Sequence, residues 1–145
     1  MARTRATGDT VGMDTTCTTH TQGTRVFLVE DSTPIRERLH EMLTDIDGVC
    51  VVGSAVAAAE ATEAILRERP DAVVLDLRLA AGSGIDVLRA VHPRAPEIDF
   101  IVLTNFAIPQ YRDLCMRAGA RHFIDKSTQI GEVKRLIAAR VHSHQ

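Results

Sequence analysis

Four short segments of the sequence, three of them apolar runs, each end in polar residues that could do chemistry. The apolar runs and their polar ends are Val26–Val29 with Glu30 and Asp31, Ala72–Leu75 with Asp76, and Phe100–Leu103 with Thr104; the fourth segment, 121–125, is mixed and precedes Lys126. Short runs of this kind, rich in β-branched residues, are typical of strands buried in a parallel sheet. Because parallel strands place their carboxyl ends at one edge of the sheet, we expect these polar groups to lie together.

Such a cluster predicts a phosphoryl-transfer site. Carboxylates within a few ångströms of one another resist ionisation unless a cation shares the site. Oxygen ligands without sulfur or imidazole favour Mg²⁺, which accepts one or two carboxylates and keeps several waters. Thr104 and Lys126 would then hold the remaining phosphate oxygens. Asp76, at the end of the continuous apolar run Ala72–Leu75, is our candidate for the carboxylate that receives the phosphoryl group.

Each of these residues alone has a simpler interpretation. Asp76 could be a helix cap or turn former, and the acids at 30 and 31 could favour the positive end of the following helix. Thr104 could be an ordinary strand-end hydroxyl, and Lys126 a solvated charge. Unrelated caps have no reason to fall at the same edge of four strands, so the joint pattern favours a common site.

The elements that must position this site alternate along the chain. Expected strands are 26–31, 49–53, 72–76, 100–104 and 121–126, and expected helices are 32–46, 57–69, 84–92, 109–118 and 128–141. Pro34 in a first turn and Gly119 after a last turn mark helix ends. Strands and helices that alternate five times, with short loops, predict an α/β protein with a doubly wound five-stranded parallel sheet and five helices.

Composition indicates one globular domain. The chain has 145 residues, of which 45% are hydrophobic and 25% charged, as in ordinary globular proteins. A net charge of −2 argues against nucleic-acid binding through a basic face, and the apolar runs are too short for a membrane span. The three cysteines lack metal-site spacing, so we expect them to be reduced, structural residues of a cytoplasmic protein.

The chain divides into two parts. Residues 1–23 are rich in Thr and show no apolar period, so we expect a disordered extension, without the apolar core of a signal peptide. Met13 is a second possible start of translation. Residues 24–142 carry the regular pattern and form the expected domain.

The strand ends together resemble the receiver domain of two-component response regulators. The residues that carry the resemblance are Val29-Glu30-Asp31, Val73-Val74-Leu75-Asp76-Leu77, Leu103-Thr104, and Gly119-Ala120-Arg121-His122-Phe123-Ile124-Asp125-Lys126. The resemblance runs from about Thr24 to Val141. It implies a flavodoxin-like fold with strand order 2-1-3-4-5.

The resemblance also implies roles for the site residues. Asp76 would take a phosphoryl group from the phosphohistidine of a histidine kinase or phosphotransfer protein. Mg²⁺ would be held by Asp31, Asp76 and the backbone carbonyl of Arg78, with Glu30 helping through water. Lys126 would contact a phosphoryl oxygen.

A switch is implied as well. Thr104 would swing toward the phosphoryl group and let the ring of Phe123 rotate inward, which would reshape the face made by the fourth helix, fifth strand and fifth helix. The alternative is that Phe123 is simply a core residue.

Several positions depart from the usual pattern of the family. Ser127 stands where a cis proline is common, and we expect a trans bond before it because a cis bond without proline costs about 2.5–4 kcal/mol. Ala80 replaces a common proline, Asn105 a small residue, and Phe123 a tyrosine. Separately, Arg78 and Phe106 lie two residues beyond Asp76 and Thr104, and we hypothesise that they set the lifetime of the phosphorylated form.

Our leading interpretation is a stand-alone receiver that controls an unidentified partner protein. A phosphate sink, a phosphorelay intermediate and a phosphate-independent binding module on the same fold are the alternatives. A phosphatase of the haloacid dehalogenase type resembles this chain in its strand-end Asp. It needs a second Asp two positions on, where this chain has Arg78, and its nucleophile lies on the first strand.

Overall fold

The predicted doubly wound sheet is present in the computed structural model, which describes residues 23–143. The strands are β2 (Thr24–Val29), β3 (Val49–Ala55), β4 (Ala72–Asp76), β5 (Asp99–Thr104) and β6 (His122–Asp125). They pair in parallel in the order β3-β2-β4-β5-β6. This is the expected order 2-1-3-4-5. The predicted extension at 1–23 lies, apart from Gly23, outside the described residues.

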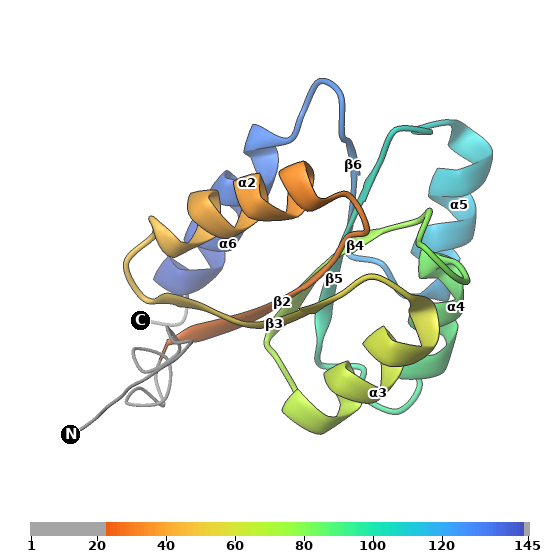
Figure 1. Ribbon diagram of the computed structural model, residues 1–145, viewed down its shortest axis with the longest axis horizontal. Helices are drawn as coiled ribbons and strands as arrows, with labels where there is room; N and C mark the ends of the chain where they lie inside the picture. Colours follow the sequence, from red (N-terminus) through yellow and green to blue (C-terminus); the bar gives the residue numbers. More distant parts are fainter. Residues whose placement is uncertain (1–22, 144–145) are drawn as a thin grey trace.

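In the described part of the chain, five helices cover the two faces of the sheet (Figure 1). They are α2 (Thr33–Thr44), α3 (Ala58–Glu68), α4 (Gly84–Val91), α5 (Pro109–Ala118) and α6 (Gly131–Ser143). Helices α2 and α6 pack on one face, where Leu39 and Ile137 belong to the same buried core as Leu28. Helices α3, α4 and α5 pack on the other, where Ile65 and Leu88 share a core with the opposite-facing strand residues. The alternation of strand side chains thus builds two cores, one on each face.

Local sequence explains how the strand that carries Asp76 is fixed. All five residues of β4 are buried. Ser83 caps the following helix in a capping box with Asp86, which satisfies backbone donors that the helix leaves free. Gly84 begins that helix against the end of β4, where a Cβ would overlap the backbone oxygen of Asp76 and lie 3.0 Å from Leu77 Cα. Only glycine allows this close approach.

The last helix begins later than the sequence predicts, at Gly131 rather than at Thr128. Asp125 organises the intervening turn. Its side chain accepts hydrogen bonds from the backbone N–H and hydroxyl of Ser127, and its N–H donates to the side-chain oxygen of Gln129. These side-chain bonds satisfy the backbone in a turn and compete with helix formation. The bond before Ser127 is trans, as expected.

The cysteines are only partly as expected. Cys115 is a buried free thiol on α5. Cys50 is disulfide-bonded, so the prediction of reduced thiols is wrong at that position. Among the described residues, no helix is both long enough and apolar enough to cross a bilayer.

Candidate functional site

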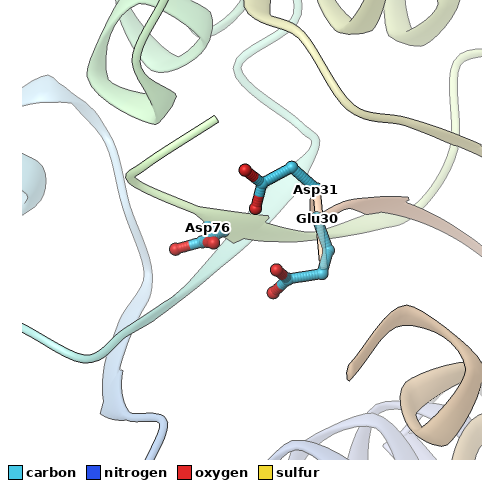
Figure 2. Close-up of side chains that lie close together, drawn as sticks. All are labelled: Glu30, Asp31 and Asp76. Carbon is cyan, nitrogen blue, oxygen red and sulfur yellow. The ribbon is translucent and has the colours of Figure 1, made fainter. Parts of the chain in front are cut away.

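Three carboxylates meet at the carboxyl edge of the sheet (Figure 2). Glu30 and Asp31 directly follow β2, Asp76 ends the neighbouring β4, and one oxygen of each lies within 4.8 Å of the other two. Glu30 and Asp76 are buried, with 1% and 5% exposure, whereas Asp31 is exposed. The cluster therefore has a buried floor and one side open to solvent.

Lys126 neutralises the buried part of this cluster. Its Nζ lies 2.9 Å from Glu30 Oε1 and 2.9 Å from Asp76 Oδ2, and only 8% of its side chain is exposed. Burial alone would lower the pKa of Lys126, but its bonds to Glu30 and Asp76 outweigh this and raise the pKa above its usual value. Lys126 is therefore a permanent cation within this site.

For Glu30, burial has a larger effect on the pKa than the pairing with Lys126. Burial raises the pKa of its carboxyl above the usual range, the bond from Lys126 lowers it, and the charge of Asp76 raises it again. Its second oxygen accepts the backbone N–H of Ser32 at 3.0 Å. Removing a buried carboxylate from water is costly unless it is paired, so Glu30 and Lys126 each depend on the other.

Thr104 closes the site from β5 and is completely buried. Its hydroxyl oxygen accepts the backbone N–H of Phe106 at 3.0 Å. Arg78 repeats this arrangement after β4, where its backbone N–H donates to Asp76 Oδ1 at 3.4 Å. In both cases the residue two positions beyond the strand is tied to the strand-end side chain, so each loop is coupled to a site residue.

Phe123 lies apart from the carboxylates. It pairs with Val102 across β5 and β6, and its half-buried ring packs against the core under α3, α4 and α5. Thr104 pairs instead with Asp125 in the same ladder. Phe123 is therefore a partly buried core residue in this structure, on the strand next to Thr104.

The structure thus brings together Glu30, Asp31, Asp76 and Lys126, with Thr104 at the adjoining strand end. Sequence reasoning missed two contacts. It did not pair Glu30 with Lys126. Side chains alternate along a strand, so Glu30 lies on the same face of the sheet as Val26 and Leu28. It also did not foresee that the guanidinium of Arg78 stacks over the ring of Phe106, 4.9 Å from the ring centroid. No local sequence signal links these two loops.

Fold and site define a doubly wound α/β protein with an acidic pocket, a lysine and a hydroxyl at the carboxyl edge of its sheet. A family model described as the response regulator receiver domain matches residues 26–138. The chain belongs to this family.

Relatives and solved structures agree with this assignment. The chain is 33% identical over 113 residues to the DNA-binding transcriptional activator DevR/DosR of Mycobacterium tuberculosis, covering 78% of this chain and 52% of that protein. The signal receiver domain of the putative response regulator NarL from the same species superposes with a TM-score of 0.75 at 25% identity, over 83% of this chain and 97% of that one. A two-component response regulator of the LuxR family from Aurantimonas gives 0.76 at 26% identity, over 83% and 86%.

The chain spans about half the length of the curated relatives that it matches. The shares are 52% for DevR/DosR and 54% for the transcriptional regulatory protein YvfU of Bacillus subtilis. The matched region is therefore the receiver portion of longer regulators.

Proposed function

We propose that Asp76 accepts a phosphoryl group from the phosphohistidine of a histidine kinase or phosphotransfer protein and thereby acts as a cytoplasmic signalling switch. One observation supports this most directly. Asp76 is buried, lies 2.9 Å from the Lys126 ammonium, and has two further carboxylates within 4.8 Å. A cation and an acidic cluster around one strand-end carboxylate suit phosphoryl transfer, which depends on positioning and charge stabilisation.

The proposed transfer moves the phosphoryl group from a histidine nitrogen to an oxygen of Asp76. An Asp76 carboxylate oxygen attacks phosphorus, the phosphorus–nitrogen bond of the phosphohistidine breaks, and its electron pair returns to the imidazole. Lys126 exchanges one of its two ion-pair partners for a phosphoryl oxygen and so stabilises the charge that is transferred. Hydrolysis later adds water to phosphorus, breaks the bond to the Asp76 oxygen and restores the carboxylate.

The carboxylates also fit the expected Mg²⁺. The donors are oxygens only, and exposed Asp31 leaves one side where the ion could keep waters. Asp31, Asp76 and the Arg78 carbonyl would hold the ion, and Glu30 would act through water. When bound, Mg²⁺ supplies positive charge to the phosphoryl oxygens.

The output is proposed to be a change in protein binding. Turning the Thr104 hydroxyl toward a phosphoryl group removes the acceptor that now holds the Phe106 N–H. The change would pass through the β5–α5 loop and Phe123 to the face made by α5, β6 and α6, which a partner protein would recognise. Arg78 and Phe106 would in addition limit the access of water to the phosphoryl group.

Intact-mass analysis after incubation with acetyl phosphate and Mg²⁺ tests the proposal. The unchanged protein should gain one phosphoryl group, Asp76→Asn should gain none, and a chelator should prevent the gain. Asp113→Asn, which changes an exposed carboxylate on α5, is the matched control and should be phosphorylated normally. A phosphoryl group that persists in Asp76→Asn would rule out Asp76 as the acceptor.

A further inference from the structure

An apolar pocket adjoins the acidic site. Its volume is about 350 Å³, and it lies between the loops that follow β4 and β5. The residues that matter here are Arg78, Leu79, Ile85, Thr104, Phe106 and Tyr111. Among the described residues, Arg78 is the one charged side chain that lines it. This volume, with the Arg78 guanidinium in place on the Phe106 ring, is at the lower end of the ~300–1,000 Å³ of small-ligand sites, so withdrawal of the guanidinium would make room for one bulky side chain.

The two walls of this pocket are tied to each other and to the acidic site. The Arg78 guanidinium on one wall stacks on the Phe106 ring on the other. The Arg78 N–H donates to Asp76, and the Phe106 N–H donates to Thr104. One wall is therefore hydrogen-bonded to Asp76 and the other to Thr104, and phosphorylation of Asp76 would affect both of these residues.

Phosphorylation would act on all three ties. It places a dianionic group two residues from Arg78, and a hydrogen bond from a guanidinium to such a group is stronger than a stack on an exposed ring. It also occupies one Asp76 oxygen and offers Thr104 a new acceptor. We propose that phosphorylation of Asp76 draws Arg78 away from Phe106 and so opens the pocket to an aromatic side chain of a partner protein.

The character of the pocket and its rim decides this occupant. Phe106, Ile108 and Tyr111 are large apolar residues with 42%, 45% and 41% exposure, and a partner that covered them would remove apolar surface from water. Once Arg78 turns to the phosphoryl group, no charged side chain among residues 23–143 lines the pocket, so the occupant is uncharged. Aromatic anchors are the residues that most often fill such pockets at interfaces. The opening by phosphorylation rests on the proposed function, whereas the pocket and the Arg78–Phe106 stack do not.

The sequence provides a reporter for a direct test. Tyr111 is the single tyrosine of the chain, which has no tryptophan, so protein made with 3-fluorotyrosine gives one ¹⁹F resonance inside the pocket. Indole serves as the probe for an aromatic side chain. We expect the ¹⁹F resonance to shift saturably as indole is added. The apparent affinity for indole should be about tenfold higher in protein phosphorylated by acetyl phosphate than in unphosphorylated protein. This ratio corresponds to an open pocket in about a tenth of the unphosphorylated molecules.

Variants separate the parts of the proposal. Arg78→Met should bind indole with the higher affinity without phosphorylation, whereas Arg112→Met, an exposed arginine beside Tyr111 that does not line the pocket, should behave as the unchanged protein. Leu79→Arg should abolish binding, and Met116→Arg, exposed and outside the pocket, should not.

Two results would overturn the inference. They are equal indole affinity in Arg78→Met and unchanged protein, and undiminished binding in Leu79→Arg. If intact mass shows no phosphoryl group on Asp76, the proposed function fails, and Arg78→Met still decides whether the stack controls the pocket. If the group is present but the Tyr111 resonance and indole affinity are unchanged, the proposed function stands and the opening is refuted.

Discussion

Replacing Lys126 by methionine should destabilise the protein strongly, because it removes the cation from two buried carboxylates. At an effective dielectric constant of about 20, two unit charges separated by the 2.9 Å of each ion pair attract by about 6 kcal/mol before desolvation is counted. Loss of one partner from a buried pair costs about 3–5 kcal/mol in practice. We expect about 3 kcal/mol, because solvent reaches the site through exposed Asp31.

Lys134 provides the matched control. It is the other lysine of the chain, and its Nζ lies 3.0 Å from Asp45, but the two side chains are 44% and 74% exposed. An exposed pair contributes about 0–1 kcal/mol. Lys134→Met should therefore change the free energy of unfolding by less than about 1 kcal/mol, although its N–O distance is nearly the same.

Urea unfolding, followed by circular dichroism, measures both variants in the presence of a chelator and again with Mg²⁺. A ligand that binds only the folded state at a hundred times its dissociation constant stabilises it by about 2.7 kcal/mol. Mg²⁺ should stabilise Lys126→Met more than it stabilises the unchanged protein, because in the variant the ion faces carboxylates that no longer share the charge of Lys126. It should stabilise Lys134→Met and the unchanged protein equally. Equal unfolding energies for the two variants in chelator would refute the assignment of Lys126 as the counter-ion of a buried cluster.

Three other predictions concern separate parts of the chain. Gly84→Ala should cost about 1–3 kcal/mol through overlap with the end of β4, whereas Gly131→Ala, with no atom within 4 Å of the new Cβ, should not destabilise; thermal unfolding compares them. Burial raises the pKa of the Cys115 thiol from 9.0 to about 11, so the stability that its proton contributes is full below pH 9 and is lost as pH rises toward 11. At pH 8, iodoacetamide should modify Cys115 about a hundredfold more slowly in the folded protein than in urea, as measured by peptide mass mapping; equal rates would contradict its burial. Replacing Arg78 and Phe106 by serine should accelerate dephosphorylation of Asp76 in a time course of intact mass, and an unchanged rate would exclude a shielding role.

The fold was predictable because burial leaves a direct trace in the sequence. The strand Ala72–Asp76 is buried along its whole length, so it is a continuous apolar run up to its last residue, and the polar residue that ends it stands out from the pattern. The convergence of Asp76 with Glu30 and Asp31 followed from parallel pairing alone. Helix starts were less predictable, because at 126–130 the side chain of Asp125 competes with the helix for backbone bonds.

Contacts between loops could not be predicted in the same way. The stack of Arg78 on Phe106 depends on the relative placement of two loops, and neither residue has a periodic neighbour that would mark it. Likewise, the pairing of Lys126 with Glu30 depends on how the turn after β6 directs one long side chain. Such contacts follow from three-dimensional placement rather than from the period of apolar residues.

The unequal exposure of the three acids has a kinetic consequence. Glu30 and Asp76 are buried at the strand ends, whereas Asp31 is exposed to solvent. A divalent ion held by this trio would face bulk water on one flank, so it could enter and leave without any rupture of the fold. In excess chelator, the ion should therefore dissociate much faster than the protein unfolds. The same exposed side of the site would admit the phosphate donor.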